Sequence, residues 1–491
     1  MQTRVSLALL CPSVVFIAHG KTKFMTHFNF GSMNRRKFLG TAAATALTTV
    51  GSSTLISKAV AGNHAQYQTP NILFILTDDL GWGDLSIYGR TDYQTPNLDR
   101  LATQGARFTN AYAAQTVCTP TRVAFLTGRY PARLEVGLRE PLGNISQVGS
   151  TVGLPPSHPT VASLLKARGY ETALVGKWHL GYLPNYGPNK SGFDKFFGHF
   201  SGGIDYFSHK DGSGTLDFYN DEQLIDVPGY TTELFTDKAI EFIKQPRNRP
   251  FYLSLHYNAP HWPWEGPDDE ILSTTLYSNG NYTAGGSPAI YAAMIKSLDD
   301  GIGRVLQALE ETGQADNTLV IFVSDNGGER YSFFGPFRNR KGSLNEGGIR
   351  VPAIIRWPGK VEPNQVKEQP IITMDLTATI LAAARVPSAP KYQLDGVNLL
   401  PALIGNKPLD SRPLFWRYRS GINIQGAVRL GNWKYLQQGS NQGLNQFLYD
   451  LASDPSEQND LKQSNPVTFQ QLQRLFDKWQ SQVLPVAQFP A

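Results

Sequence analysis

Continuous apolar runs alternate with amphipathic segments from about residue 67 to residue 400. This alternation predicts an α/β domain with a mostly parallel central sheet between helices. Runs that stay apolar at successive positions are typical of strands covered on both faces. The predicted central strands are Asn71–Leu76, Glu171–Val175, Pro250–Tyr257 and Thr318–Val323. The predicted helices, from apolar residues at helical spacing, are Asn97–Gln104, Thr160–Arg168, Thr232–Gln245 and Tyr291–Thr312.

The pattern changes near Pro401–Ser411, and the residues beyond this point predict a separate small unit. Short strand-like runs precede one amphipathic segment, so we expect an antiparallel sheet with one packed helix at about 466–483. The predicted strands are Leu414–Tyr418, Gln425–Leu430, Trp433–Gln437 and Gln446–Asp450. We therefore divide the chain into a leader (1–61), a large catalytic domain (62–405) and a small antiparallel-sheet domain (406–491).

Each of the four central strands ends in polar residues. The carboxyl ends of parallel strands meet at one edge of a sheet, where ligands gather. The residues delivered there are Asp78, Asp79, Lys177, His179, Asn258, His261, Asp325 and Asn326. Two stretches rich in glycine, asparagine and aromatic residues, 184–230 and 258–288, are predicted as loops over this edge. We expect the functional site at this edge.

Four of these residues carry oxygen donors, which are the ligands that hard divalent cations prefer. They are Asp78, Asp79, Asp325 and Asn326. No cluster of thiolates or imidazoles accompanies them, which disfavours structural zinc. Each pair also has a structural interpretation, because Asp-Asp after a strand often caps a helix and Asp-Asn-Gly favours a turn. Their position at two strand ends favours a metal site.

A single cysteine lies within a dense polar motif, Cys118 to Arg122. Thr119 is a good helix N-cap and Pro120 suits the first helical position, so Cys118 is predicted just before a helix N-terminus. Such a terminus favours an anion such as sulfate or phosphate, and Arg122 adds a charged, forked donor. The alternative is that Cys118 is simply a small buried apolar residue, as lone cysteines usually are.

The positive charge of the chain is concentrated near its start. The net charge is +5, but residues 1–61 hold seven of the 45 basic side chains and none of the 40 acidic ones. The rest of the chain is therefore close to neutral. A nucleic-acid partner is not expected, because such proteins carry a basic surface.

The first 61 residues read as an export leader. Arg35-Arg36 precedes a modest apolar stretch and then Ala59-Val60-Ala61, an order typical of a twin-arginine signal, with Met33 as an alternative start. We expect recognition by the twin-arginine export machinery and a periplasmic or secreted protein. The apolar runs are interrupted or shorter than the roughly 20 residues of a membrane span, so no stable span is expected. Cleavage would remove Cys11 and leave Cys118 as the one cysteine.

Several motifs resemble those of one enzyme family. Cys118-Thr-Pro-Thr-Arg122 with Leu126-Thr-Gly128, the segment Gly169–His179 and the segment Glu346–Pro352 resemble the type I sulfatases of the alkaline-phosphatase-like superfamily, including bacterial arylsulfatases and carbohydrate sulfatases. The ordered motifs cover about residues 67–405. The resemblance implies hydrolysis of sulfate esters by formylglycine, which a formylglycine-generating enzyme makes from Cys118. It also implies one calcium ion, bound by Asp78, Asp79, the residue at 118, Asp325 and Asn326.

The resemblance also implies roles for the basic residues. One hydroxyl of hydrated formylglycine, assisted by Asp325, attacks sulfur; His261 with Lys341 protonates the leaving alcohol; His179 then takes a proton from the second hydroxyl. The implied catalytic residues are Cys118, Arg122, Lys177, His179, His261 and Lys341. Arg122, Lys177, His261 and Lys341 are also implied to bind the substrate. Covalent catalysis of this kind divides one difficult hydrolysis into easier steps.

Three alternatives remain open. The protein is an aryl sulfate hydrolase, a phosphoester hydrolase of the same superfamily, or a non-catalytic protein that binds sulfated glycans with Cys118 left as a thiol. The cysteine motif and the lack of histidine clusters count against the phosphoester hydrolase. Aromatic residues in the predicted loops, Tyr206, Trp262 and Trp264, favour a sulfated saccharide because they offer surfaces for sugar rings, although they also suit the packing of a pocket rim.

Overall fold

The computed structural model describes residues 69–278, 285–387 and 392–486, and these belong to one compact unit, His64–Ala491. The predicted leader at 1–61 lies outside the described residues. The α/β fold class predicted from the sequence is confirmed, with a mostly parallel large sheet and a separate four-stranded antiparallel sheet near the C-terminus. None of the helices in the described ranges is both long and apolar enough to span a membrane.

The large sheet has the strand order β10-β2-β9-β8-β1-β7-β3-β4-β5-β6, and β11 pairs with β2. The four predicted central strands occur as β8-β1-β7-β3, adjacent and parallel, so their carboxyl ends share one edge. The strands are β1 (Asn71–Thr77), β2 (Ala106–Tyr112), β3 (Glu171–Lys177), β4 (Lys195–His199), β5 (Tyr219–Asn220), β6 (Gln223–Leu224), β7 (Phe251–His256), β8 (Thr318–Ser324), β9 (Arg350–Arg356), β10 (Gln365–Lys367) and β11 (Ile371–Ile372).

The sheet extends beyond the predicted strands on both sides. β9 runs antiparallel to β8 and β2, so the sheet is mixed rather than wholly parallel. β9 begins at Arg350, inside a basic stretch whose charges hide the adjoining apolar run. The prediction that 184–230 forms only loops is wrong, because β4 pairs in parallel with β3. The prediction for 258–288 is also wrong in part, because it contains the helix α6 (Glu270–Ser278).

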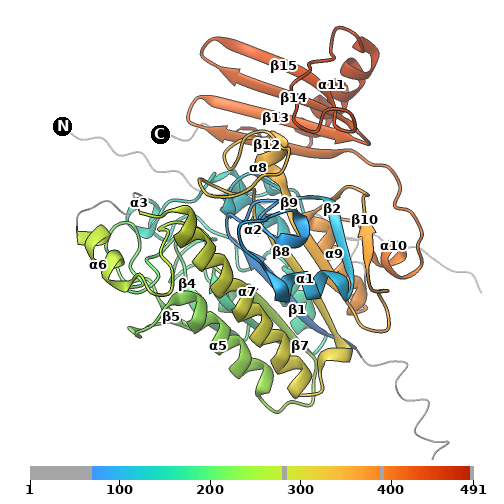
Figure 1. Cartoon of the computed structure of the whole chain (residues 1–491). Helices are drawn as coiled ribbons and strands as arrows, with labels where there is room; N and C mark the ends of the chain where they lie inside the picture. Colours follow the sequence, from blue (N-terminus) through green and yellow to red (C-terminus); the bar gives the residue numbers. More distant parts are fainter. Residues whose placement is uncertain (1–68, 279–284, 388–391, 487–491) are drawn as a thin grey trace, which may run out of the picture. The chain divides into compact units, whose positions relative to one another are not determined.

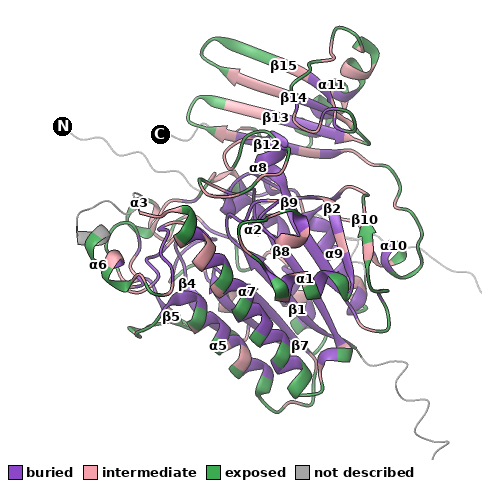
Figure 2. Cartoon of the chain, viewed as in Figure 1, coloured by how far each residue is buried: buried purple, intermediate pink, exposed green. Residues whose placement is uncertain are grey.

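Helices cover both faces of the large sheet (Figures 1 and 2). α5 and α7 lie side by side, and their buried residues join one face of the sheet in an apolar core, while α2, α4 and α9 pack together on the other face. The helices of this part are α1 (Pro96–Thr103), α2 (Cys118–Thr127), α3 (Ile145–Val148), α4 (Val161–Lys166), α5 (Thr231–Lys244), α7 (Pro288–Glu311), α8 (Glu346–Ile349), α9 (Thr373–Ala383) and α10 (Leu400–Ile404).

The C-terminal sheet has the predicted content. Its strands, in the order β12-β13-β14-β15, are β12 (Leu414–Ser420), β13 (Asn423–Leu430), β14 (Trp433–Ser440) and β15 (Gly443–Asp450). Helix α11 (Pro466–Gln480) packs closely on one face, where a Cβ added to Gly426 would lie 2.3 Å from the Phe476 ring. The division of the chain at residues 61 and 405 stays a prediction.

A buried ionic cluster joins the C-terminal sheet to helix α8, which directly precedes β9 of the large sheet. Lys434 on β14 places Nζ 2.9 Å from Glu346 Oε1 and 2.9 Å from Glu457 Oε1, and all three side chains are fully buried. Burial opposes ionisation of Glu346, but Lys434 and neighbouring arginines outweigh it and hold its pKa at about 2. The ammonium of Lys434 and the carboxylates therefore depend on one another, and removing one of them leaves a buried charge without its partner.

Replacing Lys434 by methionine is expected to destabilise the protein by about 3–5 kcal/mol, because it leaves buried carboxylates without their cation. Equilibrium unfolding in urea measures this. Lys244→Met is the matched control, since the Lys244–Glu311 pair is about half exposed and solvent screens such pairs, so that they add little to stability. Equal losses in the two variants would contradict the assignment.

Candidate active site

The motif around Cys118 starts helix α2, which is buried along its whole length. The helix begins at Cys118 itself, with Val117 as N-cap, so the prediction that Thr119 caps the helix is wrong. The Thr119 hydroxyl instead donates to the His179 carbonyl at 3.2 Å and accepts from the Leu142 amide at 3.1 Å. This buried hydroxyl satisfies backbone groups from two other segments, which a local capping rule does not foresee.

The predicted oxygen donors come together at the ends of β1 and β8. The Asp79 amide donates to Asp325 Oδ1 at 3.3 Å, and the Asn326 amide nitrogen donates to Asp79 Oδ1 at 2.7 Å. All four side chains are buried. Among the described residues, Asn326 Oδ1 has no hydrogen-bond partner. A buried acceptor without a donor, beside three carboxylates, fits a bound cation.

Cysteine and histidine complete this cluster. Asp78, Asp79, Cys118 and His261 offer ligand atoms that all lie within 4.8 Å of one another. Cys118 Sγ lies 3.4 Å from Asp78 Oδ1, and His261 Nε2 lies 3.7 Å from Asp79 Oδ2. Every predicted metal-binding residue is therefore in or beside one cluster.

Three cations pair with the carboxylates. Arg122 contacts Asp325 Oδ2 through Nη2 at 2.9 Å and Nε at 3.2 Å. The Lys177 ammonium pairs with Asp78, and Lys341 Nζ lies 2.7 Å from Asp79 Oδ1 and 3.6 Å from Cys118 Sγ. Positive and negative groups thus alternate around the cysteine, so the cluster tolerates burial.

The pKa values reflect this environment. Burial raises the pKa of the Cys118 thiol to about 12, with the Asp78 carboxylate adding to the rise. Burial also raises the pKa of Asp78, but Lys177 and the other cations outweigh it, so this pKa lies well below its ordinary value. Burial lowers the pKa values of His179 and His261, and nearby lysines lower them further.

Each histidine has one ring nitrogen fixed by a carbonyl. His179 Nε2 lies 2.8 Å from the Leu142 carbonyl oxygen, and His261 Nδ1 lies 2.5 Å from that of Trp262. A carbonyl can only accept, so these two nitrogens carry the protons in the neutral rings. The unprotonated nitrogens are then His179 Nδ1, which has no partner within the described part of the chain, and His261 Nε2.

A cavity of about 420 Å³ opens onto Cys118. Of the predicted catalytic residues, Cys118, His179, His261 and Lys341 line it. Arg122 and Lys177 are fully buried beside the carboxylates and are not among its lining residues. The site is therefore a cavity lined by the nucleophile, the two histidines and Lys341, with the buried ion pairs of Arg122 and Lys177 beside it.

The rim contains residues that the sequence did not single out. Asn144, Gln147, Ser201, Asp211 and Glu329 line the cavity. Ser201 and Asp211 lie in the stretch 184–230 predicted as loops. Asn144 and Gln147 belong to the N-cap and the body of the short helix α3, and Glu329 follows β8, so no sequence signal pointed to these three. Three further buried histidines among the described residues also escaped notice: His199 at the end of β4, His209 after it, and His256 at the end of β7.

Of the three aromatic residues expected near the substrate, only Trp262 lines the cavity. Tyr206 is fully buried, and its hydroxyl donates to the carbonyls of Asn258 at 3.1 Å and His261 at 2.9 Å. Trp264 is also buried, 5.1 Å from the ring of Tyr331. Tyr206 and Trp264 therefore support the His261 segment instead of facing a ligand.

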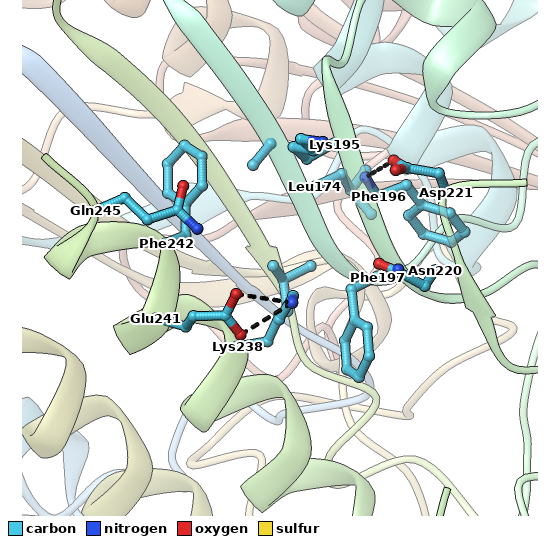
Figure 3. A pocket seen from close by; sticks show the side chains of 12 residues that line it. Leu174, Lys195, Phe196, Phe197, Asn220, Asp221, Lys238, Glu241, Phe242 and Gln245 are labelled. Atoms are coloured by element: carbon cyan, nitrogen blue, oxygen red, sulfur yellow. Dashed lines mark hydrogen bonds and ion pairs between the residues drawn. The ribbon is translucent and has the colours of Figure 1, made fainter. Parts of the chain in front are cut away.

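A second cavity, of about 190 Å³, lies between β3, β4 and α5 (Figure 3). Two of its polar contacts are internal, since Lys238 pairs with Glu241 at 2.9 Å and Asp221 accepts from the Phe196 amide at 2.9 Å. None of the predicted site residues lines it. The predicted site residues that line a cavity therefore belong to the one at Cys118.

Comparison with known proteins identifies the family. Residues 70–386 match the Sulfatase family, and residues 335–482 match the C-terminal region of N-sulphoglucosamine sulphohydrolase. The chain therefore belongs to the sulfatase family, with its alkaline-phosphatase-like fold, and is a sulfuric ester hydrolase.

Two human relatives align over most of their length. N-acetylgalactosamine-6-sulfatase is 36% identical over 391 residues, which cover 75% of this chain and 71% of that protein. Arylsulfatase A is 32% identical over 455 residues, which cover 81% of this chain and 84% of that protein. Both relatives are named as sulfatases, in agreement with the family.

Solved structures agree with the fold. Ps i-CgsB, solved in complex with k-i-k-neocarrahexaose, is 32% identical with a TM-score of 0.75, covering 84% of this chain and 93% of that one. A protein solved with its substrate D-glucosamine-2-N,6-O-disulfate is 25% identical with a TM-score of 0.66, covering 84% and 98%.

Proposed function

We propose that this enzyme removes sulfate from sulfated saccharides, using formylglycine formed from Cys118 and one calcium ion. The observation that carries the proposal is the position of Cys118. It starts a buried helix at the cavity, 3.4 Å from the nearest carboxylate oxygen and 3.6 Å from the Lys341 ammonium. A nucleophile placed between a carboxylate cluster that suits a cation and the Lys341 ammonium suits attack on an anionic ester.

Calcium fits the donors present. Asp78, Asp79, Asp325 and Asn326 would hold the ion, with the residue at 118 beside them. All of these side-chain donors are oxygens, and the Asn326 oxygen is left without a partner by the rest of the described residues. When bound, the ion would stabilise negative charge on the sulfate and favour ionisation of the attacking hydroxyl.

The two histidines that line the cavity carry out different proton transfers. Hydrated formylglycine at position 118 would supply two hydroxyls, and Asp325 would assist the one that attacks sulfur by taking its proton. His179 Nδ1, the unprotonated nitrogen, accepts the proton of the hydroxyl that does not attack. His261 Nε2 faces the cavity and, in the imidazolium form that the anionic substrate favours, donates to the leaving oxygen. Lys341 stabilises the charge that develops there, while Arg122 and Lys177 hold Asp325 and Asp78 in place.

Three features support a saccharide as substrate. The cavity volume, about 420 Å³, is in the range of small-ligand sites and leaves room for a sugar ring. Trp262 offers an aromatic surface, and Asn144 and Gln147 offer uncharged polar groups at the rim. One relative is named for a sugar sulfate, and structural neighbours were solved with k-i-k-neocarrahexaose or with D-glucosamine-2-N,6-O-disulfate.

A substrate panel tests this proposal. Sulfate released from galactose-, N-acetylgalactosamine- and glucosamine-sulfates and from sulfated oligosaccharides is compared with release from an aryl sulfate and phosphate release from a phosphomonoester. We expect the highest kcat/KM on a saccharide sulfate. An aryl-only profile would favour the aryl sulfate hydrolase, phosphate release would favour a phosphoesterase, and no release would favour a glycan-binding protein.

Replacing His261 by asparagine should affect substrates unequally. A sugar alcohol is a poor leaving group that needs a proton, so kcat on a saccharide sulfate should fall by about 10²–10⁴-fold. An aryl sulfate, whose phenolate leaves readily, should lose far less. His158→Gln is the control, because His158 packs 5.3 Å from the Tyr392 ring and is not among the cavity residues. Equal losses on both substrates would contradict the role of His261.

Maturation and location complete the proposal. The twin-arginine leader implies export to the periplasm or beyond, and conversion of Cys118 implies a formylglycine-generating enzyme in the host. The leader supports the first inference and the cysteine motif supports the second.

A further inference from the structure

The segment next to Lys341, residues 342–344, is held by two side chains from distant parts of the chain. Gln425, on β13 of the C-terminal sheet, donates through Nε2 to the Gly342 carbonyl at 3.2 Å and accepts from the Leu344 amide at 2.9 Å. Thr116 Oγ1 accepts from the amides of Gly342 at 2.9 Å and Ser343 at 3.1 Å. The backbone next to Lys341 is thus held from both sides.

The Gln425 amide is aimed at this segment by the sheet. In the register of β13 and β14, Gln425 pairs with Gln438 and Arg429 pairs with Lys434, so these side chains share one face. Arg429 and Lys434 on that face contact Asn110 and Glu346 of the large domain. Gln425 lies at the same junction, and both polar ends of its amide bind backbone groups.

Thr116 links the same segment to the nucleophile. It precedes Cys118 by two residues, and its own carbonyl accepts from the Gly342 amide at 3.2 Å. The Lys341 amide donates to the Gly328 carbonyl at 3.1 Å, so the lysine backbone is also fixed directly. The spacing between Lys341 Nζ and Cys118 Sγ, 3.6 Å, is therefore set by a short chain of hydrogen bonds.

We propose that Gln425 and Thr116 are positioning residues for Lys341, and that the C-terminal sheet takes part in catalysis through Gln425. This inference rests on the proposed function, in which Lys341 stabilises the charge on the leaving oxygen. A lysine side chain has four rotatable methylene groups. Asp79 holds the Lys341 ammonium at one end of this side chain, and a fixed backbone at the other end completes its placement. A shift of about 1 Å in such a group costs about 100-fold in rate.

The first test replaces Gln425 by methionine, which keeps the length of the side chain and removes both hydrogen bonds. We expect kcat on a saccharide sulfate to fall by about 10–100-fold. For an aryl sulfate the fall should be less than about threefold, because a good leaving group needs little stabilisation. KM should change little. A loss of folding would reduce the rates on both substrates equally. A larger fall on the saccharide sulfate than on the aryl sulfate therefore separates a positioning role from structural damage.

The matched control is Gln438→Met. Gln438 is the cross-strand neighbour of Gln425, is equally half-buried and lies on the same face, but makes none of these contacts with residues 342–344. It should leave both rates unchanged. At Thr116, the second residue that holds the segment 342–344, Thr116→Val should also lower the rate on the saccharide sulfate more than the rate on the aryl sulfate. Thr116→Ser should keep the wild-type rate because it keeps the acceptor oxygen.

A double-mutant cycle completes the test. If Gln425 acts through Lys341, Gln425→Met should add almost nothing in a Lys341→Ala background. Additive losses, or equal losses on the saccharide and aryl substrates, would overturn the inference while the sulfatase function stands. A wild-type enzyme that releases no sulfate from either substrate would overturn the proposed function and this inference with it.

Discussion

Replacing Cys118 by alanine should lower kcat for sulfate release by at least about a thousandfold, because it removes the one side chain that can become the nucleophile. The remaining groups, His261 and Lys341 among them, stabilise a leaving oxygen but cannot attack sulfur. Ion chromatography of released sulfate under single-turnover and steady-state conditions measures the loss.

The fold should survive this substitution. Cys118 is buried at the edge of the cavity, so alanine leaves a small space that already adjoins a larger one. Thermal unfolding and near-UV circular dichroism should remain close to those of the wild type. Activity within about tenfold of the wild type in a folded Cys118→Ala protein would contradict covalent catalysis at this position.

Removal of the metal should have the second largest effect. A chelator should abolish sulfate release and lower Tm, since the proposed ion stabilises the folded protein that binds it. Calcium added at about 100 times its Kd should stabilise the protein by about 2.7 kcal/mol relative to the metal-free form. Activity and Tm, followed during chelation and calcium addition, should recover together.

The substitution Asn326→Leu tests whether Asn326 is a ligand of the proposed calcium ion, because it leaves the net charge of the site unchanged. It removes the unpartnered oxygen without changing any charge, so calcium affinity measured by calorimetry should fall by about tenfold or more. Asn398→Leu, at a half-buried position that lines a cavity remote from Cys118, is the control. Recovery of the chelated enzyme with zinc but not calcium would contradict the assignment of a hard cation.

Much of the site could be predicted because strand direction and polar strand ends are both local signals. The apolar runs before Asp78, Lys177, His261 and Asp325 identify the central strands, and parallel pairing then brings their ends to one edge. The antiparallel C-terminal sheet was equally visible in its short alternating strands. The site therefore follows from topology once the strands are recognised.

The remaining features depend on contacts between distant segments. The Thr119 hydroxyl binds backbone more than 20 residues away, and Arg122 pairs with Asp325 across 203 positions. Tyr206 turns its hydroxyl to the His261 segment, and Gln425 reaches Gly342 from another sheet. No local pattern gives these contacts, because the partners of each side chain are set by the folded arrangement.

Mass spectrometry of the peptide that spans Cys118, from protein isolated from its natural host in active form, tests the central claim most directly. We predict an aldehyde at position 118, detected by its mass and by its reaction with a hydrazide probe, in a fraction that rises with specific activity. An intact thiol at position 118 in fully active protein would contradict it.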